Sequence, residues 1–201
     1  MAGGYQVALA SRNAEKLSLL ATPMKARAFE VDASSPTSVV RLFNEVDGAL
    51  GEPEVVLFNP SARIRGDLLT LDVELASAAI QTTAIGALVT AQEAARRMLP
   101  KGRGSIFFTG ATAGIKGFAR SSVFAMGKFA VRGLAQSLAR ELGPQGIHVV
   151  HFVIDGGVVQ GSQALDVLSP RAIARSYMAA LAQPSGAWSW ELELRSHVEP
   201  F

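Results

Sequence analysis

"SSVFAMGKFAVRGLAQSLARELGPQGIHVVHFVID" (residues 121–155) is the most regular pattern in this chain. Two serines lie where a helix N-cap belongs, and Gly143-Pro144 ends a helical pattern that covers residues 122–142. The apolar run at 147–154 follows at once, with the continuous hydrophobic character of a strand buried on both faces. A helix, a tight turn and a buried strand in this order indicate a parallel α/β sheet.

The same alternation extends over the whole chain. Further short apolar runs, each bounded by polar or turn-forming residues, lie at 5–10, 26–31, 53–58, 104–109 and 188–194. The longest helical patterns between them cover residues 74–99 and 122–142. We therefore predict a single α/β domain over residues 1–201, built as a Rossmann-like doubly wound parallel sheet with helices on both faces.

Composition narrows the classes of function. The net charge is +2, from 19 basic and 17 acidic residues, and no basic stripe points to nucleic acid. Cysteine is absent, which excludes disulfides and thiolate chemistry, and the three histidines are not at metal-ligand spacing. We see no signal-peptide pattern and no apolar run of membrane-spanning length, so we expect a cytoplasmic protein that binds no metal, membrane or nucleic acid.

Small polar residues follow the predicted strands. In an open parallel sheet, ligands bind outside the carboxyl ends of the strands, so these residues are the candidate binding set. They are Ser11, Arg12, Asn13, Asp32, Asn59, Gly110, Ala111, Thr112, Asp155, Gly156 and Gly157.

Two cations in this chain allow either a functional or a structural interpretation. An arginine such as Arg12 after an early strand of a dinucleotide fold accommodates a ribose 2′-phosphate, although a solvated loop arginine is the more common case. Lys128 lies one helical turn after Phe124, among small and apolar neighbours. It either faces a ligand or extends along the helix to solvent beside a packing phenylalanine.

Taken together, these residues resemble the short-chain dehydrogenase/reductase family. The matching pieces include "VALASRNAEKL" (7–17), Asp32, "FNPSA" (58–62), "GSIFFTGATAG" (104–114), "GKFAVRGLAQSLARELGPQGIHV" (127–149) and "IDGG" (154–157). The chain is most similar to a divergent subgroup in which phenylalanine replaces the usual tyrosine of the family.

The resemblance implies hydride transfer between NADP(H) and a carbonyl or alcohol. Lys128 matches the family's lysine, which binds the nicotinamide ribose and lowers the pKa of a tyrosine. Phe124 lies at the position of that tyrosine, Ala111 at that of a substrate-binding serine, and Thr83 at that of an asparagine in a proton relay. The cofactor-binding positions that carry over are Ser11, Arg12, Asn13, Asp32, Asn59, Lys128, Asp155, Gly156 and Gly157.

Other groups could replace the missing tyrosine. Asp155 would need a raised pKa to donate a proton at neutral pH, and it is otherwise expected to accept hydrogen bonds from turn N–H groups. Tyr177 and His151 lie in a predicted helix and strand, where we expect them to be packed in the core.

The resemblance also implies that the first strand, glycine-rich turn and helix of the family are missing from this sequence, since "MAGGYQVALASRN" (1–13) leads straight into the family's second strand. The resemblance implies NADP(H) as the cofactor, although the glycine-rich turn that would bind its phosphates is missing. Two hypotheses follow: an NADP(H)-linked oxidoreductase with a degenerate active site, or a catalytically inactive homologue that serves as a binding or oligomerisation scaffold. In both cases the resemblance implies that the helices at 74–99 and 122–142 pair between subunits. Small residues such as Gly127 and Gly133 permit this contact, so we expect a homodimer or homotetramer.

Overall fold

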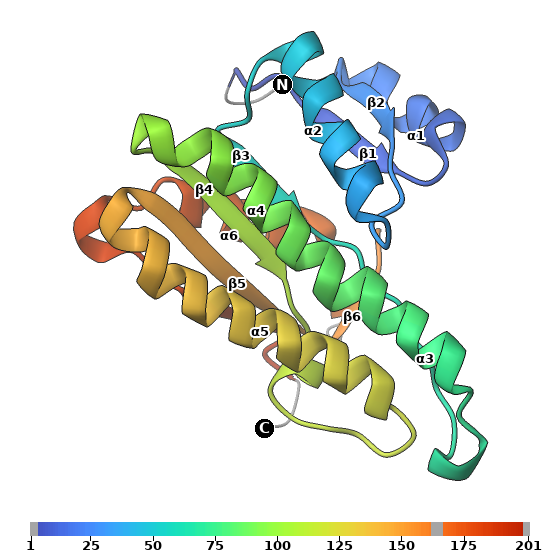
Figure 1. Ribbon diagram of the computed structural model, residues 1–201. Coiled ribbons are helices and arrows are strands. Elements are labelled where there is room, and N and C mark those ends of the chain that lie inside the picture. Colours follow the sequence, from blue (N-terminus) through green and yellow to red (C-terminus); the bar gives the residue numbers. More distant parts are fainter. Residues whose placement is uncertain (1–3, 162–166, 199–201) are drawn as a thin grey trace.

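Strands and helices alternate along the chain, as the sequence predicts (Figure 1). The computed structural model describes residues 4–161 and 167–198. The strands are β1 (Ala8–Ser11), β2 (Arg27–Glu30), β3 (Val55–Phe58), β4 (Gly104–Thr109), β5 (Ile147–Asp155), β6 (Gly157–Val158), β7 (Val167–Leu168) and β8 (Glu191–Arg195). The α-helices are α1 (Ala14–Ala21), α2 (Pro36–Leu50), α3 (Val73–Ile80), α4 (Gly86–Met98), α5 (Ser122–Leu142) and α6 (Pro170–Leu181).

The strands pair in parallel, as the sequence predicts, and they are divided among separate sheets. Strands β3, β4, β5 and β8 form a four-stranded sheet in the order β3-β4-β5-β8. Strands β1 and β2 form a separate parallel pair, and β6 with β7 forms a short third sheet. The separation has a simple cause: within the described residues, no strand lies between β1 and β3 to hydrogen-bond with both.

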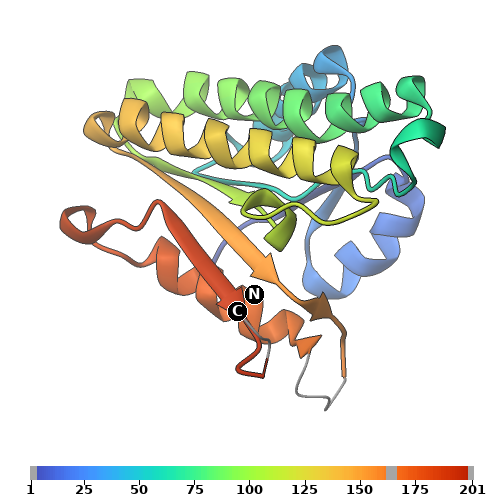
Figure 2. The ribbon, with the colours of Figure 1, turned by 90° about the horizontal axis from the view of Figure 1, so that it is seen from below.

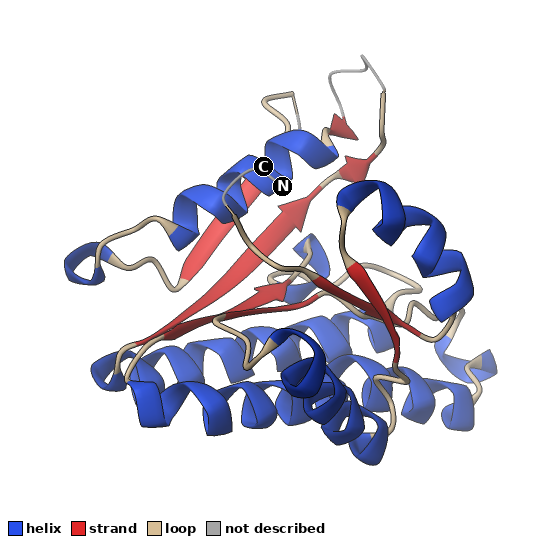
Figure 3. Cartoon of the chain, turned by 90° about the horizontal axis from the view of Figure 1, so that it is seen from above, coloured by secondary structure: helices blue, strands red, loops and turns tan. Residues whose placement is uncertain are grey.

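Helices cover both faces of the main sheet, which confirms the α/β prediction (Figures 2 and 3). Helices α2, α4 and α5 pack on one face, where Phe108 and Ile106 of β4 are fully buried in the larger core. Alternation along the strand turns Phe107 to the other face, where it packs with Phe152 and α6. Because β4 and β5 are buried on both faces, their sequences are almost continuously apolar.

Helix α5 has the predicted bounds and begins after one of the two serines expected at its N-cap. Ser121 occupies the N-cap position, yet its side chain makes no capping hydrogen bond. The φ/ψ of Ser121, −135° and 25°, lies outside the extended conformation that a capping serine usually adopts. The predicted N-cap position of Ser121 is therefore confirmed, without a capping bond from its side chain, and the end of the helix at Leu142, before Gly143-Pro144, is confirmed as well.

Helices α3 and α4 form one long rod, joined by a π-helical segment at Gln81–Ile85. Among the described residues, the segment Val73–Lys101 is the one helix long and apolar enough to span a membrane by length and composition alone, which is weak evidence of a span. The expectation that no apolar stretch reaches this length is wrong, because residues 75–92 carry no charged side chain. Only 22% of the apolar window is buried, so much of it lies on the surface.

Candidate functional site

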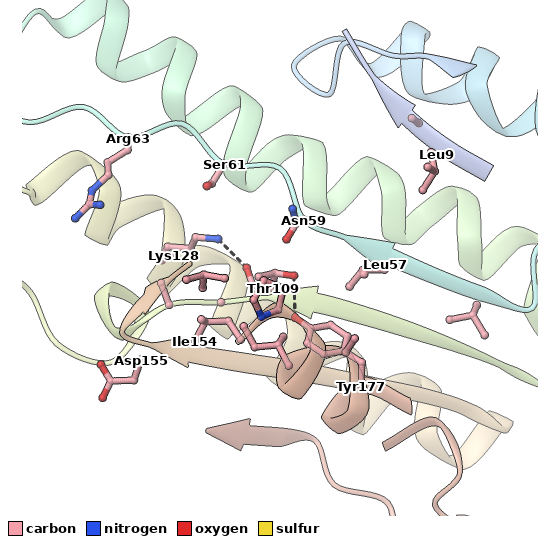
Figure 4. Close-up of a pocket in the computed structure, with 18 of the residues that line it drawn as sticks. Leu9, Leu57, Asn59, Ser61, Arg63, Thr109, Lys128, Ile154, Asp155 and Tyr177 are labelled. Atoms are coloured by element: carbon pink, nitrogen blue, oxygen red, sulfur yellow. Dashed lines mark hydrogen bonds between the residues drawn. The ribbon is translucent and has the colours of Figure 1, made fainter. Parts of the chain in front are cut away.

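Lys128 is buried near the carboxyl end of β4, on the face of the sheet covered by α5. Its exposed fraction is 3%, and its Nζ donates a hydrogen bond to the main-chain oxygen of Thr109, 2.7 Å away (Figure 4). Burial lowers the pKa of the ammonium group to about 8, because the charged form loses its hydration. The side chain therefore does not extend to solvent, and that alternative for Lys128 is excluded.

Phe124 lies one helical turn before Lys128, and two cations flank its ring. The Lys128 Nζ is 5.9 Å from the ring centroid, and the guanidinium carbon of Arg63 is 5.1 Å from it. Cations are attracted to the face of an aromatic ring at such distances. The ring has no ionisable hydroxyl, so this position cannot transfer a proton.

The loop after β4 supplies hydroxyls, but each is already hydrogen-bonded. Ala111 has no hydroxyl of its own. The Thr109 hydroxyl lies 2.9 Å from that of Tyr177, and Thr112 donates to the carboxylate of Asp155. Burial raises the pKa of Tyr177, whose ring stacks on Phe152 at 3.7 Å between centroids. Tyr177 is thus a packed residue, as the sequence predicts.

Asp155 serves the fold rather than acid chemistry. Its carboxylate forms an ion pair with Arg195 of β8 at 2.6 Å and accepts the Thr112 hydroxyl. Although burial alone would raise the pKa of this carboxyl, the bonds from Thr112 and Arg195 hold the pKa below its usual value. Asp155 is therefore ionised at neutral pH. Neither predicted role, proton donor or acceptor of turn N–H groups, is observed; instead the Asp155 carboxylate links β5 to β8 through its ion pair with Arg195.

Thr83 lies in the π-helical segment and is fully buried. Its Oγ1 accepts a hydrogen bond from the main-chain N–H of Ala62 at 3.0 Å, and a side chain at Gly127 would contact its methyl group at 3.1 Å. Thr83 thus anchors the segment after β3 against α5. A π-helical turn in a helix is often associated with a functional site.

The ends of β1 and β2 form a second polar group. Asn13 caps α1 through its side-chain oxygen, which accepts the N–H of Lys16 at 2.8 Å, and the Ser11 hydroxyl donates to the Asn13 carbonyl. The carboxylate of Asp32 accepts both the hydroxyl and the N–H of Ser34, and these bonds lower its pKa. Arg12 is exposed and, in the part of the chain that the structure describes, has no carboxylate within ion-pair distance.

A large open cavity connects these features. Its volume is about 2250 Å³, and it extends from the space between β1 and β3 to the carboxyl ends of β4 and β5. The predicted site residues that line it are Asn59, Ala111, Phe124, Lys128, Asp155, Gly156 and Gly157. Those outside its lining are Ser11, Arg12, Asn13, Asp32 and Thr83. Gly156 has φ 140°, a conformation that side chains rarely adopt, so a glycine is needed there.

Sequence reasoning missed Arg63 and the Thr112–Asp155–Arg195 cluster. Arg63 could have been found, since it closes the same polar loop after β3 that singled out Asn59. Arg195 could not, because nothing local in the sequence pairs it with a residue 40 positions earlier.

The buried lysine at a parallel sheet's carboxyl edge is accompanied by a sequence match over most of the chain. Residues 1–166 match the family model described as short chain dehydrogenase. The chain belongs to the short-chain dehydrogenase family. This confirms the resemblance that the sequence motifs indicate.

Individual relatives agree with this assignment. A short-chain dehydrogenase from Rhodopseudomonas palustris is 35% identical, with a TM-score of 0.86 over 96% of this chain and 88% of that one. A metagenomic short-chain oxidoreductase in complex with NADP shares the fold, with a TM-score of 0.84 over 98% and 87% of the two chains at 22% identity. The 3-oxoacyl-[acyl-carrier-protein] reductase MabA of Mycobacterium avium is 30% identical over 118 residues, and the match covers 59% of this chain and 46% of MabA.

Proposed function

We propose that this chain is an NADP(H)-linked carbonyl/alcohol oxidoreductase with a degenerate active site, which retains ligand-binding groups and lacks the family's proton-donating tyrosine. The observation that carries the proposal is Lys128, a buried ammonium that opens onto the cavity beside the end of β4. Burying a charge without a carboxylate partner is costly, so its presence calls for a functional reason. A related structure of this fold holds NADP.

The donor set fits the two ends of such a dinucleotide. At one end, Arg12 presents an exposed guanidinium suited to a 2′-phosphate, while the Asp32 carboxylate beside it is engaged by Ser34. At the other, Lys128 and Asn59 would hold the hydroxyl groups of the nicotinamide ribose. When bound, the nicotinamide supplies or accepts the hydride.

We propose that this chain binds the dinucleotide by its two ends, and that a strand, glycine-rich turn and helix, which these residues do not contain, would hold its middle. Among the described residues, no strand pairs with the facing edges of β1 and β3, and the cavity extends between these two strands. Exposed Leu57 of β3 lines this space with Tyr177 and Met178 of α6. Two open parallel edges and an apolar wall suit one further strand with a helix behind it.

The proposed site has few groups that could donate a proton to the substrate. The hydroxyls of Thr109 and Thr112 are both engaged, and Phe124 and Ala111 have none. Burial lowers the pKa of Lys128 to about 8, near neutrality, so we propose its ammonium as the proton donor to a substrate oxygen.

Restoring the missing hydroxyls tests this proposal. The double variant Phe124→Tyr/Ala111→Ser is expected to raise the kcat for NADPH-dependent reduction of simple ketones roughly a hundredfold, the usual value of one positioned acid. The readout is NADPH absorbance over a panel of ketones and aldehydes. Phe129→Tyr, on the exposed side of the same helix, is the matched control and should change nothing. A double variant no faster than this control contradicts the proposal.

The second candidate is an inactive homologue that acts as a scaffold. It is favoured by the same absent hydroxyls and by exposed apolar side chains on α4 and α5, among them Leu88, Met126 and Phe129. Under this alternative the chain assembles into a homodimer or homotetramer through these helices. We propose this assembly for both candidates, since an apolar surface on neighbouring helices is typical of subunit contacts.

A further inference from the structure

Each carboxylate that lines the cavity forms an ion pair with a basic side chain that lies outside the cavity wall. Glu52 pairs with Lys101 at 2.5 Å, Glu54 with Arg103 at 3.3 Å and Asp155 with Arg195 at 2.6 Å. None of the three basic partners belongs to the cavity wall. Among the described residues, the wall therefore presents no carboxylate without a cationic partner.

Most basic side chains of the cavity wall, in contrast, have no carboxylate of the described residues within ion-pair distance. Arg120 pairs with Asp67 at 3.1 Å, but no carboxylate of the described chain lies within ion-pair distance of the other four. These four are Arg63, Arg65, Lys116 and Lys128. The cavity is consequently positive at the end that contains Lys128, although the chain as a whole is nearly neutral.

Arg63 is the best placed of the exposed cations. Its guanidinium lies over the ring of Phe124, and the Nζ of Lys128 lies near the same ring. It belongs to the segment after β3 that also carries Asn59 and Ser61, and this segment faces Lys128 across the mouth of the cavity (Figure 4). A group held between Arg63 and Asn59 would thus be next to the end of Lys128.

Resting on the proposed function, we propose that the carbonyl compound bound in this cavity carries an oxyanion, a carboxylate or a phosphate monoester, and that Arg63 binds it. The planar guanidinium offers paired N–H donors that match the two oxygens of such a group. Arg65 and Lys116 add to the positive potential that attracts it. A neutral ketone would leave Arg63, which has no carboxylate of the described residues within ion-pair distance, without a counter-charge.

Matched pairs of small ketones test this without any cofactor. Acetoacetate is compared with methyl acetoacetate, and dihydroxyacetone phosphate with dihydroxyacetone, by NMR-detected titration of the intact chain. Each anion is expected to bind at least about tenfold more tightly than its neutral partner, the value of one charge-assisted contact. Arg63→Gln should remove that difference, whereas Arg41→Gln, an exposed arginine of α2 outside the cavity wall, should preserve it.

Three results would overturn the inference: equal binding of anion and neutral partner, anion binding that survives Arg63→Gln, and competitive displacement of acetoacetate by NADPH. The last would assign these cations to cofactor phosphates instead. A separate NADPH titration keeps the two proposals distinguishable. Anion binding lost in Arg63→Gln, without NADPH binding, supports this inference and contradicts the proposed function, while NADPH binding without anion preference does the reverse.

Discussion

At the scale of single residues, the proposed site combines a buried lysine with a neighbouring phenylalanine. Lys128 is buried with no carboxylate of the described residues within ion-pair distance, and the ring of Phe124 lies one helical turn away. The sequence predicts both positions, because a lysine amid small apolar neighbours is unusual enough to single out. Its burial and its bond to the Thr109 carbonyl depend on tertiary packing that no local pattern encodes.

The lowered pKa of Lys128 makes stability depend on pH. Between the folded-state pKa of about 8 and the ordinary lysine pKa of 10.5, the folded chain has lost a proton that the unfolded chain keeps, so stability rises with pH in that window. From pH 7 to 9.5 the free energy of unfolding should rise by about 2 kcal/mol more in the parent chain than in Lys128→Met. Urea unfolding of both chains at the two pH values measures this. Parallel pH profiles would mean that Lys128 is not desolvated.

At the scale of elements, the hydrophobic pattern of the sequence predicts where strands and helices lie along the chain. It does not predict which of these elements contact one another. The helix at 122–142 and the strand at 104–109 have the bounds expected from the sequence. The π-helical segment at Gln81–Ile85 was not predictable, since its residues continue the helical pattern on both sides. It is fixed by contacts with chain segments that are distant in sequence, such as the bond from Ala62 to Thr83.

Gly86 marks one of these contacts and provides a test. A Cβ there would lie 2.4 Å from the main-chain oxygen of Ala33, which cannot move without displacing the end of β2. Gly86→Ala should therefore lower the free energy of unfolding by about 2 kcal/mol through overpacking, despite the better helix propensity of alanine.

Gly48 in α2 is the matched control, because a Cβ there meets nothing within 4 Å. Gly48→Ala should raise the free energy of unfolding by roughly 0.5–1 kcal/mol. Chemical denaturation of the three chains decides the matter, and a stabilised Gly86→Ala would show that α4 does not pack against this loop.

At the scale of the whole molecule, two parallel sheets lie on either side of an open cavity, and apolar helix surface remains uncovered. The class of fold and its strand order along the chain could be predicted from the sequence. The split between β1 and β3 could be anticipated only through the family resemblance. The charge of the cavity wall could not be predicted, because it depends on which carboxylates of the wall form ion pairs with basic residues outside it.

The exposed apolar residues of α4 and α5 predict self-association. Met126→Glu/Phe129→Glu should convert a dimer or tetramer into a monomer, because buried like charges at a subunit contact are unfavourable. Light scattering at micromolar concentration measures the mass, with Leu19→Glu, at an exposed residue of α1, as the control. A monomeric parent chain would contradict the prediction.

The most direct test of the proposed function is a calorimetric titration of the purified 201-residue chain with NADPH and with NADH, repeated for Arg12→Gln. We expect NADPH to bind more tightly than NADH, and Arg12→Gln to bring the two affinities together by weakening NADPH about tenfold. No binding of either dinucleotide would show that these residues form the fold without a cofactor site, and would favour the scaffold instead.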